Sequence, residues 1–266
     1  MRPALAALLA WLAWLAAGSM AAAAADAARP DKLVFALRPL PPYMEVTPGG
    51  FGGAHVEILQ RLADRLRVRL DIVECPLVRC LRMLQEGSAD VTMGLAMTPE
   101  RVASIVLLEP PYAAASPTYF YQRVGDRRPL RGYDDLVGRR IGVVRGVRYF
   151  DEFDGDARLD KQEAPDVETN FRKLAAGRLD VVPVGANVAA AIVGDPRFAG
   201  RVRPAEWVRP NPVMRRMALG LGSPWLERRA ELDAALAAMV DAGETRAILD
   251  RYESAHAAAC RKARRC

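Results

Sequence analysis

Histidine and cysteine are scarce in this chain, and neither has the spacing of a metal site. The 266 residues include two histidines and four cysteines. A structural zinc site needs closely spaced cysteine pairs, usually together with histidine. The chain also lacks a P-loop and a nucleophile elbow. We therefore expect no metal, no other cofactor and no enzymatic activity.

An apolar run long enough to cross a bilayer is also lacking. Residues 4–17 form an apolar run of about 14 residues, shorter than the roughly 20 needed for a membrane span. Arg2 precedes the run, and an A-x-A site at Ala23 and Ala25 follows it. This pattern is typical of a secretory signal peptide. We expect residues 1–25 to be cleaved on export; an uncleaved N-terminal anchor is the alternative.

The overall composition is that of a globular protein. Hydrophobic residues make up 51% of the chain and charged residues 26%, which excludes a disordered, fibrous or multi-span membrane protein. The net charge of +6 would suit nucleic acid, anionic lipid or small anions, so charge alone does not choose among them. The basic residues are dispersed, and together with export this leads us to expect no nucleic-acid partner.

The cysteines form two local pairs, Cys75 with Cys80 and Cys260 with Cys266. An exported protein meets an oxidising compartment, where disulfides persist. We predict both bridges, with four free thiols as the alternative. A bridge that closes a loop of about six residues contributes on the order of 2 kcal/mol in the chain-entropy model.

Apolar periodicity indicates strands and helices that alternate along both halves of the chain. Strands are predicted at 32–37, 68–73, 90–95, 140–144, 180–184 and 217–221. Helices are predicted at 55–66, 77–85, 166–176, 224–240 and 244–253, with a further helix start at Thr98-Pro99-Glu100 and another after Gly146. The alternation predicts mostly parallel sheets covered on both faces. We expect the basic tail from Ala255 to be frayed or solvated.

A short echo links the two halves. The pattern Arg82-x-Leu84-x-x-Gly87-x-x-Asp90-Val91 recurs as Arg172-x-Leu174-x-x-Gly177-x-x-Asp180-Val181. The same spacing of helix end, glycine stop and strand start indicates one structural unit used twice, although a chance match between two such units is the alternative.

Several motifs resemble family 3 of the bacterial extracellular solute-binding proteins, the periplasmic receptors of polar-amino-acid ABC transporters. The matching stretches are Pro41-Pro42-Tyr43, residues 53–59, residues 87–101 followed by Glu109-Pro110-Pro111-Tyr112, and Asp135-Leu136-x-Gly138 with residues 141–143. The likeness covers roughly residues 32–253, and the run Thr98-Pro99-Glu100-Arg101 is its most diagnostic part.

The resemblance implies an α/β fold of the type II periplasmic binding protein class, with a ligand cleft between two αβ lobes. Lobe 1 would comprise residues 31–116 and 215–254, lobe 2 residues 121–210, and the C-terminal tail residues 255–266. Two crossover segments, near 117–120 and 212–214, would act as the hinge. The expected partners are a small-molecule solute and an inner-membrane ABC permease, and we expect a periplasmic monomer.

The resemblance also implies which residues meet the solute. Arg101 would grip a carboxylate, because a guanidinium makes two parallel charge-assisted bonds to it; a solvated arginine is the alternative. The predicted ligand-binding residues are Arg101, Tyr43, Leu95, Ala96, Arg79, Arg145, Arg148, Tyr149 and Asn187. Backbone N–H groups of the loop 146–149, at a helix start, would favour an anion, and Tyr43 would stack on the ligand.

Two departures from the family pattern bear on the ligand. First, the acid with which the family pairs a ligand ammonium is missing: its position falls near Gly185, and Asn187 is the closest polar residue. Second, His55 stands where the family's first-helix motif has aspartate. A small carboxylate or other anion therefore fits better than a standard α-amino acid. The alternative function is an enzyme similar to the cyclohexadienyl dehydratases, which needs a cleft acid; Glu45 and Glu109 are the suggestive carboxylates.

Overall fold

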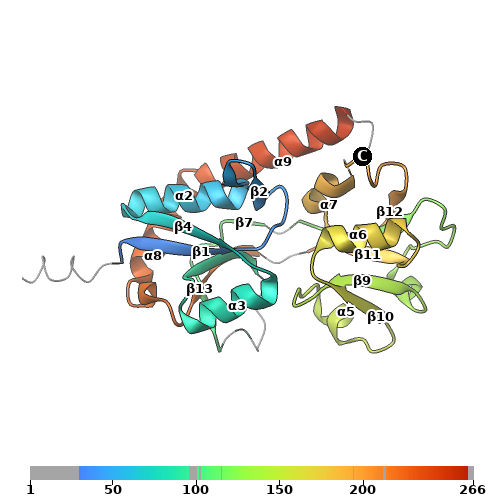
Figure 1. Ribbon diagram of the computed structural model, residues 1–266, viewed down its shortest axis with the longest axis horizontal. Coiled ribbons are helices and arrows are strands. Elements are labelled where there is room, and N and C mark those ends of the chain that lie inside the picture. Colours follow the sequence, from blue (N-terminus) through green and yellow to red (C-terminus); the bar gives the residue numbers. More distant parts are fainter. Residues whose placement is uncertain are drawn as a thin grey trace, which may run out of the picture.

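Two lobes, each a sheet covered by helices, make up the protein (Figure 1). The computed structural model describes residues 30–95, 101, 103–114, 116–193, 195–211 and 214–262. Within this part of the chain, no helix combines the length and the apolar character that a bilayer span needs.

The first lobe has a mixed sheet in the order β4-β1-β5-β13-β6, with β7 also paired to β13. Its strands are β1 Lys32–Leu37, β4 Arg69–Glu74, β5 Val91–Leu95, β6 Ile105–Leu107, β7 Ala113–Ala114 and β13 Met214–Gly220. Its helices are α2 Ala54–Leu66, α3 Leu77–Glu86, α8 Arg229–Asp241 and α9 Glu244–Lys262, with a 3-10 turn at Pro224–Leu226. Helices α2, α8 and α9 pack on one another, whereas α3 packs on β1 and β13 over a separate apolar cluster. A ribbon of β2 Glu45–Thr47 and β3 Gly50–Gly52 adjoins α2.

The second lobe has a five-stranded sheet in the order β10-β9-β11-β8-β12. Its strands are β8 Thr118–Arg123, β9 Arg140–Val144, β10 Asp160–Ala164, β11 Val181–Gly185 and β12 Val202–Arg209. Its helices are α5 Asp151–Gly155, α6 Val167–Ala175 and α7 Ala186–Val193, with a 3-10 turn at Tyr133–Leu136. Helix α9 of the first lobe reaches across to contact α7 of the second (Figure 1).

The prediction of mostly parallel sheets is only half right. In each lobe three strands pair in parallel: β4-β1-β5 in the first and β10-β9-β11 in the second. The remaining strands pair antiparallel, among them β13 on β5 and β8 on β11. The strands β8 and β13 follow a crossing from the other lobe, so they enter their sheets from the opposite end.

Helix boundaries near the C-terminus also differ from the predictions. The helix predicted at 224–240 begins as a 3-10 turn, and α8 starts only at Arg229. The last helix was predicted to end at 253, but α9 continues to Lys262 because the Ala-rich segment favours helix over a frayed tail. The predicted helix start at residues 98–100 lies outside the described residues.

The echo between the halves corresponds to the same unit in each lobe. Helix α3 ends on Gly87 with φ 73°, and α6 is followed by Gly177 with φ 72°; both are left-handed conformations that favour glycine. In each case the chain then turns through aspartate into the next strand, β5 or β11.

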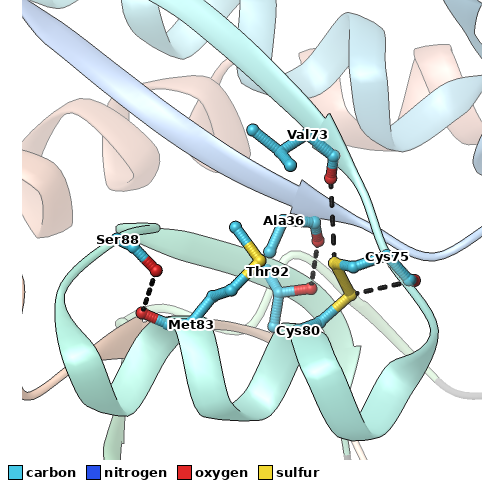
Figure 2. The surroundings of a disulfide bond; sticks show 7 residues. All are labelled: Ala36, Val73, Cys75, Cys80, Met83, Ser88 and Thr92. Carbon is cyan, nitrogen blue, oxygen red and sulfur yellow. Dashed lines mark hydrogen bonds between the residues drawn. A yellow bond between two sulfur atoms is a disulfide. The ribbon is translucent and has the colours of Figure 1, made fainter.

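A disulfide joins Cys75 and Cys80, as the spacing predicts (Figure 2). It ties the end of β4 to the first turns of α3, and both cysteines are buried in the cluster beneath that helix. The predicted Cys260–Cys266 bridge lies outside the residues whose side chains are described.

Candidate functional site

A cleft runs between the two lobes, and the described residues line three adjoining cavities in it. The central cavity, of about 240 Å³, draws its walls from both lobes, including Arg38, Tyr43 and His55 of the first and Arg148 and Tyr149 of the second. A larger cavity of about 720 Å³ shares Arg148 and Tyr149 with it. A third, of about 370 Å³, shares Arg38. The three cavities therefore form one interlobe cleft.

Arg38 follows the last residue of β1 and projects into the cleft from the first lobe. Its side chain makes no hydrogen bond or ion pair with any residue that the structure describes. Burial lowers the pKa of its guanidinium to about 10; Tyr149 opposes this shift and Arg101 adds to it. The group therefore stays charged at neutral pH. Sequence reasoning missed Arg38, although its place at the carboxyl end of a parallel strand was the available signal.

Behind Arg38 lies an aromatic cluster that includes the buried His55. The His55 ring stacks on Tyr43 at 4.9 Å, and its Nε2 lies 3.0 Å from the Tyr112 hydroxyl. Burial, together with the charges of Arg215 and Arg38, holds the pKa of His55 well below its usual range, so the imidazole is neutral. His55 thus adds no charge to this wall.

Tyr43 is part of the same wall and lines the central cavity. Its hydroxyl donates to Glu253 at 2.9 Å, and the Arg215 guanidinium lies 5.0 Å from its ring centre. Arg215 also pairs with Glu253 at 3.3 Å. Because His55 and Arg215 already lie against the ring, the stacking of Tyr43 on a ligand stays a prediction.

The loop at Gly146 packs the second lobe against the first. Gly146 has φ 76°, and a Cβ there would lie 3.2 Å from the Val78 side chain of α3. Its carbonyl accepts a hydrogen bond of 2.6 Å from Arg101 Nη2. Arg101 is buried and lines the large cavity rather than the central one. Arg101, which we predict to bind a solute carboxylate, therefore also takes part in a hydrogen bond between the lobes.

A short helix follows the Gly146 loop, as predicted, but it does not begin within the loop. Helix α5 begins only at Asp151 and has five residues, and its first turn carries acidic side chains. An acidic first turn does not favour an anion. The expectation that backbone N–H groups at a helix start make this loop favourable for an anion therefore does not apply. Tyr149 nevertheless faces the cleft: its oxygen accepts the Val144 N–H at 3.0 Å, and burial raises its pKa to about 12. Its hydroxyl proton is thus retained and available for donation.

The other predicted residues are distributed unevenly. Leu95 lines the central cavity. Arg145 is exposed and pairs with Glu163 at 2.9 Å, and Arg79 is exposed on α3; neither is among the residues that line the three cavities. Ala96 lies outside the described residues, and Asn187 lies in α7 with its side chain undescribed.

Charge is distributed asymmetrically in the cleft. The described residues that line the central cavity include Arg38, Arg148 and Arg215 but no aspartate or glutamate. Two carboxylates of the third cavity have other partners: Asp166 caps α6 through the Thr169 N–H, and Glu168 pairs with Arg197. Across the described part of the chain, no three His, Cys, Asp or Glu side chains gather as metal ligands.

Proteins of known structure share this fold. An ancestral arginine-binding protein bound to arginine has 22% identity and a TM-score of 0.71, covering 84% of this chain and 98% of its own. An amino acid ABC transporter substrate-binding protein from Streptococcus pneumoniae bound to L-arginine has 21% identity and a TM-score of 0.72, covering 85% and 96%. A histidine kinase sensor domain with similarity to periplasmic binding proteins has 21% identity and a TM-score of 0.72, covering 84% and 96%. No curated protein matched the chain.

The family comparison extends over nearly all of the two-lobed region. The model of the bacterial extracellular solute-binding proteins, family 3, matches residues 33–255. This range includes both sheets and the cleft between them. The chain therefore belongs to family 3 of the bacterial extracellular solute-binding proteins.

Proposed function

We propose that this protein is a periplasmic receptor that captures a small carboxylate- or anion-bearing solute and delivers it to an ABC transporter permease. Residues 1–25 would be the cleaved signal peptide, and the mature protein would act as a monomer. The lobes would comprise residues 31–116 with 215–254 and residues 121–210. The membership of β13 in the first sheet and of β8 to β12 in the second supports these boundaries.

The proposal that the solute is an anion rests on the charge of the central cavity. Arg38, Arg148 and Arg215 line it without an aspartate or glutamate among the described lining residues. A cationic solute such as arginine would bring another guanidinium into a partly buried site with no acid to pair with it, which is unfavourable. An anionic solute is stabilised by charge-assisted hydrogen bonds from the same arginines.

Binding would proceed by closure of the lobes about the crossover segments. The bond from Arg101 to the Gly146 carbonyl joins the lobes directly. The loop 146–149 and Arg101 therefore lie both at the contact between the lobes and in the cleft. We retain Arg101 as a contact for a solute carboxylate.

A thermal-shift panel on the purified mature protein tests the choice of ligand class. Plain carboxylates are expected to raise the Tm, because a ligand that binds only the folded state stabilises it, and the more so the further its concentration exceeds the Kd. Arginine and lysine serve as charge-reversed controls of similar size and are expected to leave the Tm unchanged. If amino acids alone stabilise the protein, the anion proposal is wrong.

Delivery to a permease needs a separate test in cells. Deleting the gene is expected to abolish uptake of the radiolabelled carboxylate identified in the panel, and the intact gene on a plasmid should restore it. Unchanged uptake would contradict delivery and would favour a sensing role, as in the histidine kinase sensor domain of the same fold.

The dehydratase alternative has little support in the cleft. Glu45 and Glu109 do not line the three cavities, and Glu109 pairs with Arg216. A general acid must reach the reacting group. Incubation with prephenate or arogenate is therefore expected to give no aromatic product, and formation of that product would reverse this view.

A further inference from the structure

Arg38 differs from the other arginines of the cleft in having no partner among the described residues. Arg101 bonds to the Gly146 carbonyl, and Arg215 bonds to the Ala114 carbonyl and pairs with Glu253. Arg148 also has contacts within the protein. Arg38 alone of these four brings an unpaired guanidinium to the cleft within the part of the chain that the structure describes.

No described carboxylate forms an ion pair with Arg38, although Glu74, Asp166 and Glu168 also line the third cavity. The groups that act on it electrostatically are Tyr149, which is protonated at neutral pH, and the like-charged Arg101. His55, also influenced by Arg38, is neutral. Arg38 is half-buried, and even partial removal of a charge from water is costly without a counter-charge. A group from outside the protein that carries negative charge would offset this cost.

A buried donor without a partner belongs to another arginine of the same cavity. Arg215 Nη1 is buried and has no hydrogen-bond partner in the described structure, although its Nη2 and Nε are bonded. Arg38 and Arg215 both line the central cavity and both act on His55. The first lobe therefore presents to the central cavity one buried donor without a partner, Arg215 Nη1, and the half-buried guanidinium of Arg38, both separate from the Arg101 bridge.

We propose that Arg38 binds a second anionic group of the solute, so that the ligand is a short dicarboxylate without an ammonium group. This inference rests on the proposed function, which assigns one carboxylate to Arg101. The second carboxylate lies in the central cavity, where Arg38 makes a charge-assisted bond and Tyr149 donates its hydroxyl proton. A central cavity of about 240 Å³ is small for a ligand site, which favours a chain of few carbons.

A different role for Arg38 is a latch between the lobes. Arg38 also lines the third cavity, together with Glu74 of the first lobe and Asp166 and Glu168 of the second. A latch would act on closure itself, so its loss would weaken every ligand equally. A contact for the second carboxylate would act only on ligands that carry one.

Isothermal titration of the mature protein with matched ligands separates these roles. Glutarate and pentanoate have the same number of carbons but differ in one carboxylate, and L-glutamate adds an ammonium group to glutarate. The variant Arg38→Gln keeps a polar side chain, and Arg246→Gln, on an exposed face of α9, removes the same charge as a control.

In the wild-type protein, glutarate is expected to bind at least 30-fold more tightly than pentanoate and more tightly than L-glutamate. Arg38→Gln should weaken glutarate by about 30-fold, the size of one charge-assisted bond, and pentanoate by less than about 3-fold. Arg246→Gln should change neither. The ligand-free Arg38→Gln protein should have an unchanged or higher Tm, because an uncompensated charge is removed.

Three results would overturn the inference. Equal binding of glutarate and pentanoate would show that one carboxylate suffices, and equal losses for both in Arg38→Gln would assign Arg38 to a latch. A lower Tm in ligand-free Arg38→Gln would show that the protein itself supplies the counter-charge. Absence of binding by every carboxylate would instead refute the proposed function.

Discussion

The two lobes place an aspartate at the same point of the same unit, yet they surround it differently. Asp90 leads into β5 and Asp180 into β11, and each carboxylate accepts a backbone N–H from the neighbouring strand. Val34 donates to Asp90 at 2.7 Å, and Arg140 donates to Asp180 at 2.9 Å. The two aspartates therefore make the same backbone contact.

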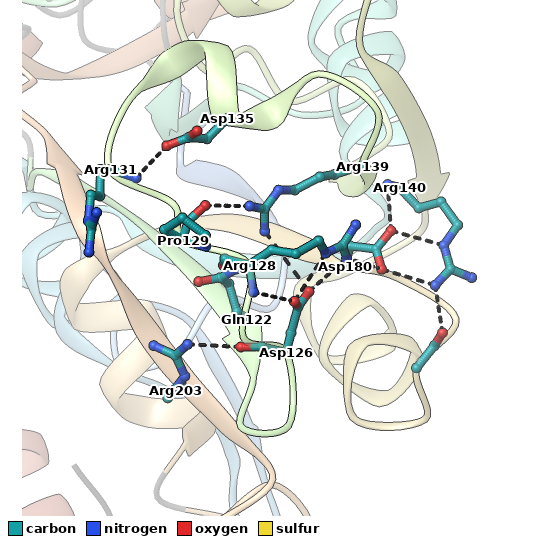
Figure 3. Close-up of polar contacts among 11 residues, drawn as sticks. Gln122, Asp126, Arg128, Pro129, Arg131, Asp135, Arg139, Arg140, Asp180 and Arg203 are labelled. Carbon is teal, nitrogen blue, oxygen red and sulfur yellow. Dashed lines mark hydrogen bonds and ion pairs between the residues drawn. The ribbon is translucent and has the colours of Figure 1, made fainter.

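Their side-chain partners are of opposite kinds. Asp180 bonds to the guanidinium groups of Arg140 and Arg128, which hold its pKa well below the usual range (Figure 3). Asp90 accepts the Ser223 hydroxyl at 2.5 Å, and burial raises its pKa despite that bond. The two aspartates thus make the same backbone hydrogen bond, but their pKa values shift in opposite directions. In the second lobe the protein's own carboxylates neutralise arginines, whereas no carboxylate of the described residues pairs with Arg38 in the cleft.

The largest expected difference between the two units lies at their glycines. A Cβ at Gly87 would overlap the Gly222 carbonyl of the backbone, while one at Gly177 would lie 3.1 Å from Nη1 of the flexible Arg123 side chain. Both positions add about 1–2 kcal/mol of left-handed strain. We expect Gly177→Ala to destabilise by about that amount and Gly87→Ala by more than about 3 kcal/mol, measured by urea unfolding. Equal losses would show that the close approach at Gly87 relaxes freely.

Asp180→Asn should have the next largest effect. The variant loses the charge that Arg140 and Arg128 share, and we expect it to lower the free energy of unfolding by about 2 kcal/mol at pH 7. Because the pKa of Asp180 is lowered in the fold, this stabilisation is present above about pH 4, where the unfolded carboxyl is ionised, and is lost below it. The difference from wild type should therefore shrink as the pH falls below about 4. Asp241→Asn, at an exposed position of α8, is the control.

Asp90→Asn should have the smallest effect and the opposite pH dependence. Asparagine resembles the protonated carboxyl, so we expect a change within about 1 kcal/mol at pH 7. Because the pKa of Asp90 is raised in the fold, the folded state binds a proton more readily than the unfolded state does. The wild type should gain stability relative to the variant as the pH falls from 7 toward 4. Parallel pH profiles for the Asp90 and Asp180 variants would contradict the comparison.

Much of the fold follows from local signals in the sequence. The strand at 32–37 has the predicted bounds, and Asp166 caps α6 by accepting the Thr169 N–H at 2.6 Å. Such signals involve neighbours along the chain. Strands β8 and β12 were not predicted, and the antiparallel pairing of β13 was not either, because both depend on how the chain returns from the other lobe.

The candidate site was less predictable than the fold. Arg79 and Arg145 resemble Arg38 in the sequence, yet they are exposed and do not line the cleft cavities. A single arginine gives no sequence signal of burial, because its surroundings come from distant segments. Tyr149, for example, lies far along the chain from Arg38 but acts on its pKa.

The sequence by itself determined the family, the repeated unit and the Cys75–Cys80 bridge. These depend on linear order and short spacings, which a chain carries before it folds. Only the tertiary structure decided which arginines have partners. Arg101 meets the Gly146 carbonyl and Arg215 meets Glu253 across long stretches of chain, whereas Arg38 meets no carboxylate among the described residues. Ion pairing depends on distances of a few ångströms, and packing of the two lobes sets those distances.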